Sequence, residues 1–314
     1  MQLSDRIGRR MKLHDLHVLM AVVQAGSMGK AAETLNTSQP NISRSIAELE
    51  HAFGVRLLER HRQGVEPTEY GRALLAGGVA VFDDLRQAVK NIEFLADPAA
   101  GELRIGSSAF LAASFVSAVI DRLSRCYPRI VFHLVTAPTE TLKHDLSERK
   151  VDLLIARRFA PIADESLDFE FLFDESFVVA AGKRNPWARR RRVALADLMN
   201  EPWVLPPPDS LIGSVAMGAF RASGLDYPRA TVFALTPEVR TSLLATGRFL
   251  TIFPASVLKF PVTRPELKVL PIDLPGARVA NGVVTLKSRT RSPVAQLFVA
   301  HARELAKPLA KKTA

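Results

Sequence analysis

Apolar side chains recur every three or four residues through the first fifty positions of the chain, which is the spacing that buries one face of a helix. This pattern predicts three helices, over residues 13–26, 28–35 and 38–53. Gly26 ends the first helix, and Asn36 breaks the pattern after the second. Together the three predicted helices are enough to form a small helical core.

The third predicted helix has two contrasting faces. Ile42, Ile46, Leu49 and Phe53 form its apolar side, whereas compact hydrogen-bonding side chains lie on the other side near its start. A helix that enters the DNA major groove needs such short polar groups, because bulky side chains would hold it away from the base edges. The pattern predicts a helix-turn-helix, although Ala, Leu and Ile at these intervals also pack ordinary helical corners. The residues expected at DNA are Ser27, Thr37, Ser38, Gln39, Pro40, Asn41, Ser43 and Arg44.

Residues 55–67 are typical of two short strands around a turn at Gln63 and Gly64, which is the pattern of a hairpin wing. Arg60 and Arg62 lie near the predicted tip, where they could meet phosphates or the minor groove. The alternative is a solvated turn. Beside a predicted helix-turn-helix, the DNA role is favoured.

A long helix is predicted next, from Thr68, which can cap it, to about Leu95. Its apolar positions alternate four and three residues apart, as in a coiled-coil seam. Gly77 and Gly78 each weaken such a helix by roughly 1 kcal/mol relative to Ala, so the seam favours pairing with a second copy of the chain. An amphipathic helix packed on its own domain is the alternative. The seam consists of Leu74, Gly78, Val81, Leu85, Ala88, Ile92 and Leu95.

Beyond a hinge-like stretch at residues 97–101, strand and helix patterns alternate, which predicts an α/β unit with a mainly parallel sheet. The order repeats after about residue 165, so two such units joined by two crossings are expected. Strands are expected at 102–106, 130–136, 151–156, 176–181, 203–205, 231–235, 250–253, 269–272 and 279–286, and helices at 111–125, 139–148, 212–222, 237–245 and 293–305.

The predicted fold is therefore α+β and multidomain. It combines a winged helix-turn-helix, a long linker helix and a two-lobed α/β domain of the periplasmic-binding-protein type. The expected divisions are a disordered prelude at 1–10, the winged helix-turn-helix at 11–68, the linker helix at 69–97, the two-lobed domain at 98–308 and a tail at 309–314. Lobe I is expected at about 101–163 and 270–308, and lobe II at about 164–269.

Composition limits the class of protein. At 314 residues, with 24% charged and 47% apolar side chains, the chain is typical of a globular protein. Its apolar runs fall short of a membrane span, and its first ten residues are too polar and charged for a signal peptide. A cytoplasmic protein without a membrane partner is expected.

The one cysteine, Cys126, allows neither an intramolecular disulfide framework nor a cysteine-based zinc site. Its position at the end of a predicted helix favours a packed thiol over a redox sensor. The seven His residues show no metal-ligand spacing, so neither a metal nor a cofactor is expected.

The net charge of +10 does not by itself indicate nucleic-acid binding, because the basic residues are concentrated elsewhere. Residues 1–70 hold nine Lys and Arg against eight Asp and Glu, whereas residues 201–314 hold fifteen against seven. The arrangement of individual side chains therefore matters more than the total charge.

Two other classes of protein are disfavoured. The sequence has no G-x-S-x-G elbow, no phosphate-binding G-x-x-x-x-G-K-[ST], no G-x-G-x-x-G and no H-E-x-x-H, so an enzyme is not expected. An exported solute-binding protein would fit the last two-thirds of the chain alone. It would need an export signal and would not need a helix-turn-helix.

The run from Ser27 to Glu50, followed by F-G-V-R-L-L-E-R and P-T-E-Y-G, closely resembles the N-terminal domain of LysR-type transcriptional regulators. About fifty residues match in order and spacing. The resemblance implies a DNA-binding regulator in which the long helix makes a dimer and the two-lobed domain binds a small-molecule co-inducer. It also implies further assembly to a tetramer. The expected partners are double-stranded operator DNA, the effector and a second copy of the chain.

In such folds the ligand lies between the lobes, at the carboxyl ends of strands and the starts of helices. Two adjacent arginines, Arg157 and Arg158, follow the third strand of the first lobe and would suit a carboxylate or phosphate, although either could face solvent. Ser107 and Ser108 could instead only cap a helix. The positions carried over from the resemblance are Ser107, Ser108, Thr136, Arg157, Arg158, Pro207, Ser210, Thr236 and Phe253.

The tract from Arg60 to Thr68, with Trp203 to Asp209, is similar to regulators grouped with the galactose-binding-protein regulator and the activators of the protocatechuate pathway. This similarity implies a sugar-derived or aromatic acid as effector. Trp187 and the basic block 189–192 are interpreted as a solvated loop, with contact to DNA or RNA polymerase as the alternative.

Overall fold

A computed structural model describes residues 11–61, 64–158, 165–258, 260, 266–276 and 278–310. The chain divides into two compact units, residues 1–88 and 89–314, which are described separately. The predicted prelude at 1–10, Arg62 and Gln63 of the predicted turn, and residues 311–314 of the predicted tail lie outside the described residues.

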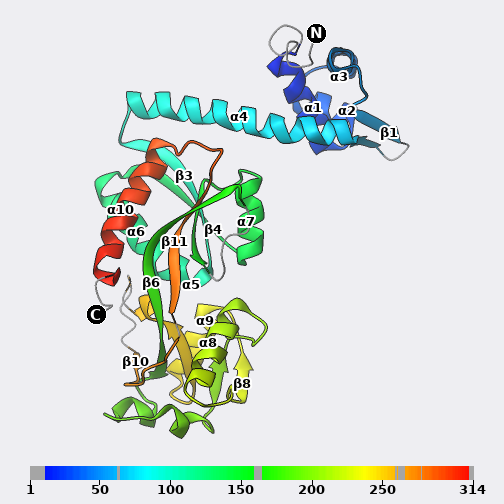
Figure 1. The fold of residues 1–314 in the computed structure, drawn as a ribbon. Helices are drawn as coiled ribbons and strands as arrows, with labels where there is room; N and C mark the ends of the chain where they lie inside the picture. The colour runs from blue at the N-terminus through cyan, green and yellow to red at the C-terminus, as the bar shows by residue number, and fades with distance from the viewer. Residues whose placement is uncertain are drawn as a thin grey trace. The chain divides into compact units, whose positions relative to one another are not determined.

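The N-terminal unit contains the three predicted helices and the hairpin (Figure 1). Gly26 and Gly54 end two of the helices in the left-handed conformation, with φ of 65° and 74°. The elements are α1 (Leu13–Ala25), α2 (Met28–Thr34), α3 (Gln39–Phe53), β1 (Leu58–His61), β2 (Gly64–Pro67) and the start of α4 (Glu69–Ala96).

The apolar face of α3 packs against α1 and α2, as the pattern predicts. Ile42, Ile46 and Leu49 are each 1% exposed in the core of this unit. The wing is fixed to the same core by its backbone. The Glu50 carboxylate accepts hydrogen bonds from the N–H groups of Leu57 and Leu58, at 2.8 and 3.2 Å. The orientation of the wing therefore depends on the end of α3.

The long helix α4 begins where Thr68 caps it, because the Thr68 hydroxyl accepts a hydrogen bond from the N–H of Gly71 at 3.1 Å. The predicted seam has two environments. Leu74 packs on the core of the N-terminal unit, and Gly78 lies against Leu16. The later positions are exposed, namely Val81 at 41%, Leu85 at 44%, Ile92 at 68% and Leu95 at 82%. The start of the seam therefore packs on its own domain, which is the alternative given above. The rest of the seam is an exposed apolar stripe.

In the first lobe of the C-terminal unit, helices cover a sheet whose order begins β4-β3-β5 (Figure 1). The strands β3 and β4 are parallel, as are β3 and β5. The elements are β3 (Ala100–Ser107), the continuous helical run α5 (Ala109–Leu111), η2 (Ala112–Val116) and α6 (Ser117–Cys126), then β4 (Arg129–Thr136), α7 (Thr139–Ser147), β5 (Leu153–Arg158) and α10 (Pro293–Ala310).

The second lobe repeats this arrangement around a separate core that contains Trp203 and Phe220. Its strand β7 is parallel to both β8 and β9. The elements are η3 (Pro186–Arg189), η4 (Leu195–Leu198), β7 (Trp203–Leu205), α8 (Leu211–Ala222), β8 (Ala230–Phe233), α9 (Pro237–Ala245), β9 (Leu250–Pro254), η5 (Ala255–Leu258) and β10 (Leu267–Val269).

Two long antiparallel strands, β6 (Leu167–Gly182) and β11 (Arg278–Leu286), run between the lobes (Figure 1). The sequence predicts β6 only from residue 176, and it places the lobe boundary at about 164. The structure corrects both expectations. Phe173 packs in the core of the first lobe, whereas Phe177 packs in the core of the second. The crossing therefore falls between these residues, and the sheet is mixed because β6 and β11 oppose their neighbours.

The last helix, α10, extends to Ala310, beyond the predicted end at Leu305 and into the predicted tail. Leu305 and Leu309 both pack partly against the core of the first lobe. This packing accounts for the extension past Pro308, which the helix tolerates near its end, where one missing N–H breaks a single hydrogen bond.

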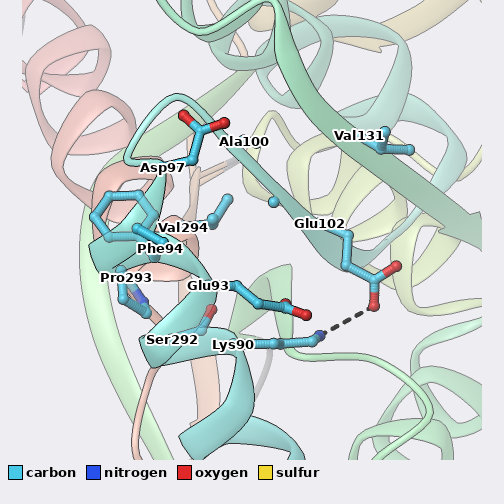
Figure 2. A pocket seen from close by; sticks show the side chains of 12 residues that line it. Lys90, Glu93, Phe94, Asp97, Ala100, Glu102, Val131, Ser292, Pro293 and Val294 are labelled. Carbon is cyan, nitrogen blue, oxygen red and sulfur yellow. Dashed lines mark ion pairs between the residues drawn. The ribbon is translucent and has the colours of Figure 1, made fainter.

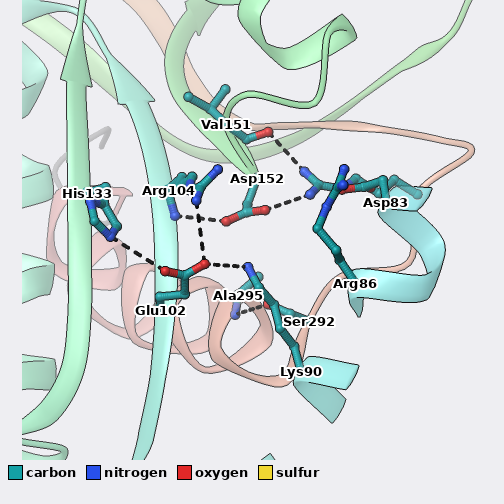
Figure 3. A network of polar contacts seen from close by, with 11 residues as sticks. Asp83, Arg86, Lys90, Glu102, Arg104, His133, Val151, Asp152, Ser292 and Ala295 are labelled. Atoms are coloured by element: carbon teal, nitrogen blue, oxygen red, sulfur yellow. Dashed lines mark hydrogen bonds and ion pairs between the residues drawn. The ribbon is translucent and has the colours of Figure 1, made fainter. Parts of the chain in front are cut away.

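A network of charged groups ties together the outer side of the first lobe (Figure 3). The Glu102 carboxylate lies 3.2 Å from Lys90 and 3.7 Å from both Arg104 and His133. The hydrogen bond from Lys90 holds the pKa of Glu102 below its usual value, although partial burial opposes this shift. These contacts fix β3 and β4 to the last turns of α4.

Candidate functional site

Helix α3 presents a polar, solvent-exposed surface at its N-terminal end. Gln39, Pro40, Asn41 and Arg44 are exposed there, and none of them belongs to the apolar core of the unit. Thr37 and Ser38 precede the helix and are also exposed. The positive end of the helix dipole suits a phosphate at this end, although Pro40 has no N–H and the N–H of Asn41 donates to the Ser38 carbonyl at 3.0 Å.

Two of the predicted contact residues pack within the helical pair. The Ser43 hydroxyl is half-buried and lies 3.4 Å from the Met28 sulfur on α2. Ser27 is half-buried at the N-terminal cap of α2. A third residue, Asn41, is exposed but donates a hydrogen bond to the Thr37 hydroxyl at 3.2 Å. These contacts preset the turn before α3 and leave Gln39 and Arg44 free to extend outward.

The wing carries one described arginine of the predicted pair. Arg60 is exposed on β1, and the next residue, His61, lies 3.5 Å from Glu59. The hairpin is pinned to the turn between α1 and α2, because the N–H of Val65 donates to the carbonyl of Gly26 at 3.0 Å. Arg60 is therefore held on the same unit as α3.

In the C-terminal unit, the structure brings several predicted residues to one end of the first lobe's sheet. Ser107 ends β3 and is the ladder partner of Thr136, which ends the parallel strand β4, and of Ile155 within the parallel strand β5. The Ser107 hydroxyl is fully buried and donates to the Ile155 carbonyl at 2.8 Å, a hydrogen bond that joins β3 to β5. Thr136 is exposed on the edge strand β4.

The two adjacent arginines have different environments, because successive side chains of a strand point to opposite faces. Arg157 is 7% exposed, and its Nη1 donates to the Ser108 hydroxyl at 3.2 Å. Burial lowers the pKa of Arg157 to about 10, and the nearby Glu175 carboxylate opposes this shift. Arg158 is exposed and stacks on the Phe169 ring, 5.4 Å from its centroid.

In the second lobe, two predicted residues, Ser210 and Thr236, are the N-caps of helices, and Pro207 lies in the loop before the first of them. The Ser210 hydroxyl caps α8 by accepting from the N–H of Gly213 at 3.0 Å, and it donates to the carbonyl of Pro207 at 2.6 Å. Thr236 precedes α9 and is exposed. The Ser210 hydroxyl and the Pro207 carbonyl are therefore hydrogen-bonded to each other.

Phe253 is fully buried, and so is Arg240, which packs against it. The sequence patterns do not single out Arg240. The Arg240 guanidinium lies between the rings of Phe110 and Phe253, 5.3 and 5.0 Å from their centroids. Its Nε and Nη2 donate to the Thr251 hydroxyl at 3.0 and 2.6 Å, and Nη2 also donates to the carbonyl of Ile252. Because Phe110 belongs to the first lobe, this arginine lies where the lobes touch.

Two further buried polar residues lie near the crossing strands and are absent from the predicted set. Glu175 is 2% exposed and accepts hydrogen bonds from the N–H and hydroxyl of Ser256 at 3.0 and 2.5 Å. Asn281 is fully buried on β11, as the ladder partner of Arg157. Neither position has a sequence signal, because Glu175 precedes the strand predicted at 176–181 and Asn281 is a single polar residue inside the strand predicted at 279–286.

A separate hollow of about 700 Å³ lies at the junction of the last turns of α4 with β3 and the start of α10 (Figure 2). Apolar groups of Phe94, Val131 and Pro293 line it, beside the carboxylates of Glu93 and of Asp97, which pairs with Arg129 at 2.7 Å. Lys90, the lining cation, is paired with Glu102 at 3.2 Å. This chemistry does not suit an anionic ligand.

Cys126 is exposed at the end of α6, which corrects the expectation of a packed thiol. Its helix ends there, so the thiol lies beyond the apolar face that Leu123 buries. Within the described part of the chain, no three His, Cys, Asp or Glu residues gather as metal ligands. Among the described helices, none combines the length and apolar character that crossing a membrane requires.

Comparisons with known proteins match nearly the whole chain. The family of bacterial regulatory helix-turn-helix proteins of the lysR type matches residues 13–72, and the LysR substrate binding domain matches residues 96–307. The HTH-type transcriptional regulator GbpR of Azospirillum brasilense is 26% identical over 295 residues, which cover 94% of this chain and 86% of GbpR. YdcI of Escherichia coli, an uncharacterized HTH-type transcriptional regulator, is 26% identical over 95% of this chain and 97% of its own length.

Solved structures show the same fold. A full-length OxyR variant from Pseudomonas aeruginosa superposes with a TM-score of 0.66 at 21% identity, covering 97% of this chain and 99% of that one. Full-length CbnR in complex with its target DNA superposes with a TM-score of 0.55 at 23% identity, covering 94% of this chain and 100% of that one.

Proposed function

The chain belongs to the LysR family of bacterial helix-turn-helix regulators, and from this premise we propose how its own residues perform that role. The protein is a DNA-binding transcriptional regulator with an effector-binding domain, and it is not an enzyme. We place its action in the cytoplasm, where bacterial DNA lies. The observation that carries the proposal is the exposed polar surface at the start of α3, which includes Gln39 and Arg44.

DNA contact is assigned to two regions with different tasks. Gln39 and Asn41 in the first turn of α3 read base edges, because amide side chains form paired hydrogen bonds with adenine. Arg44 and the wing residue Arg60 contact phosphates and set the position of the unit on the duplex. Two copies of α3 are needed to read two half-sites, and the exposed stripe of Val81, Leu85 and Ile92 supports assembly through α4.

The effector is assigned to the crossing between the lobes, where Arg157 and Ser108 meet. A small molecule changes DNA binding only if it binds one arrangement of the lobes better than the other. Buried groups at the crossing provide this difference, because parting the lobes changes their surroundings while the outer surface of each lobe stays the same.

Two alanine substitutions test the division between reading and positioning. Gln39→Ala is expected to weaken binding to the specific site by about 5- to 150-fold, with little effect on random DNA, because a base contact is worth about 1–3 kcal/mol. Arg60→Ala is expected to weaken binding to both DNAs similarly and to reduce the salt slope by about 1. The measurement is a set of fluorescence-anisotropy titrations at several salt concentrations.

Each variant serves as the control for the other, since both lie on exposed positions of one folded unit. Equal loss on specific and random DNA for Gln39→Ala would remove its base-reading role. A loss confined to the specific site for Arg60→Ala would contradict phosphate contact by the wing.

A further inference from the structure

The Arg157 guanidinium has one of its edges occupied and the other open. Its Nη1 donates to Ser108, whereas Nε and Nη2 are buried and have no hydrogen-bond partner within the structure as described. Nε and Nη2 share one edge of the guanidinium, and their N–H groups point in parallel. This edge is the one that a carboxylate binds with two hydrogen bonds.

The other buried arginine, Arg240, shows the opposite arrangement. Its Nε and Nη2 both donate to the Thr251 hydroxyl, so that the same edge is filled from within the protein. Only Nη1 of Arg240 lacks a partner among the described residues. Arg240 is thus built into the lobe contact, and Arg157 is the arginine with an edge left for a ligand.

A second buried group faces the same place. Asn281 lies directly opposite Arg157 in the antiparallel pair of β11 with β5, so the two side chains project from the same face of the sheet. Asn281 is fully buried, and both Oδ1 and Nδ2 lack partners among the residues that the structure describes. The register between β11 and β6 shifts at Asn281 and Gly282, and such a bulge re-aims the side chain beside it.

Four unpaired polar atoms on two neighbouring side chains are a costly arrangement. A buried donor or acceptor without a partner costs about 1–3 kcal/mol, and folded proteins leave few of them. At Arg157 and Asn281 the donors and acceptors are adjacent, so a single polar ligand could satisfy them together.

The nearby Glu175 carboxylate does not occupy the open edge of Arg157. Glu175 offsets part of the Arg157 charge, but its oxygens accept from the N–H and hydroxyl of Ser256 and leave the open edge of Arg157 unoccupied. The helical run from Ala109 to Cys126 begins directly after Ser108, and the N–H groups of its first turn add positive potential.

We propose that the effector is a carboxylate with a hydroxyl or oxo group on the neighbouring carbon. The carboxylate binds Nε and Nη2 of Arg157, and the amide of Asn281 binds the second oxygen. This inference rests on the proposed function, because it names the chemical class of the molecule bound between the lobes. Entry requires the lobes to part about β6 and β11, since both residues are buried.

The first test needs no ligand. Asn281→Asp places a carboxylate opposite the open edge of Arg157, and it is expected to raise the Tm of the C-terminal unit by about 3 °C or more at pH 7. In the Arg157→Met background, the same Asn281→Asp change is expected to lower the Tm, because the new carboxylate is then buried without a cation. A similar Tm change in both backgrounds would overturn the pairing of these two residues.

The second test uses matched acids that differ at the neighbouring carbon: malate and succinate, mandelate and phenylacetate, pyruvate and propionate. For the wild-type full chain, at least one hydroxy or oxo acid is expected to bind about tenfold or more tightly than its partner, measured by thermal shift and calorimetry. Asn281→Asp is expected to abolish this difference. Equal binding within every pair, or no binding by any hydroxy or oxo acid, would overturn the class.

The outcomes also separate this inference from the proposed function. DNA binding to the chain's own upstream region is measured without acid, so failure of the acid panel leaves the regulator intact. If the chain binds a hydroxy acid tightly but does not distinguish that DNA from random DNA, the proposed regulatory function is contradicted, whereas the inferred acid-binding site stands.

Discussion

Replacing Arg240 by Ala is expected to lower the free energy of unfolding of the C-terminal unit by about 3–5 kcal/mol. The guanidinium is fully buried and fills the space between the Phe110 and Phe253 rings. Its removal leaves a cavity there and takes the hydrogen bond from the Ile252 carbonyl. Urea unfolding followed by tryptophan fluorescence measures the effect, because both tryptophans, Trp187 and Trp203, lie in this unit.

Arg240→Met separates packing from charge. Burial lowers the pKa of Arg240 to about 9, so the side chain is still charged at pH 7 and its desolvation opposes folding. Methionine keeps most of the side-chain volume without that charge. The loss in the free energy of unfolding is therefore expected to be smaller for Arg240→Met than for Arg240→Ala by about 1.5 kcal/mol or more. Equal losses for the two variants would show that the guanidinium hydrogen bonds, and not the filled space, hold the lobes.

Replacing Gly71 by Ala is expected to destabilise the N-terminal unit by about 3 kcal/mol and to abolish DNA binding with it. A Cβ at Gly71 would lie 2.1 Å from the carbonyl oxygen of Leu57, a backbone atom that cannot rotate away. Relief of this clash requires α4 to move off the segment that leads into the wing. The measurements are helical circular dichroism on heating and DNA binding.

Gly77→Ala is the matched control on the same helix. A Cβ at Gly77 meets no atom within 4 Å, so the variant is expected to gain about 0.5–1 kcal/mol from helix propensity alone. The tryptophan unfolding transition should be unchanged in both variants, because the tryptophans lie in the other unit. A loss of stability in Gly77→Ala like that in Gly71→Ala would contradict the steric account.

The elements that the sequence predicts well are those defined by neighbouring residues. The period of Ile42, Ile46 and Leu49 sets the buried face of α3, and Gly26 and Gly54 end two helices by adopting positive φ. The start of α4 follows in the same way from the capping residue Thr68. Each of these features depends on contacts within a few turns of chain.

The features that the sequence does not reveal depend on residues far apart. β6 is a single strand through two cores, because it pairs with β11 along one half and with β9 along the other. Arg240 and Asn281 carry no local signal, since their surroundings come from the opposite lobe and from a neighbouring strand. Of the predicted effector residues, Ser107 instead donates to the Ile155 carbonyl on the neighbouring strand β5, and Ser210 donates to the nearby Pro207 carbonyl.

The central claim is that the chain recognises a specific DNA sequence. The most direct measurement is the affinity of the purified full chain for the DNA upstream of its own coding region, compared with random DNA of equal length across a range of salt concentrations. A specificity ratio of about 10³ or more at physiological salt is expected. Equal, weak and steeply salt-dependent binding to both DNAs would contradict the claim.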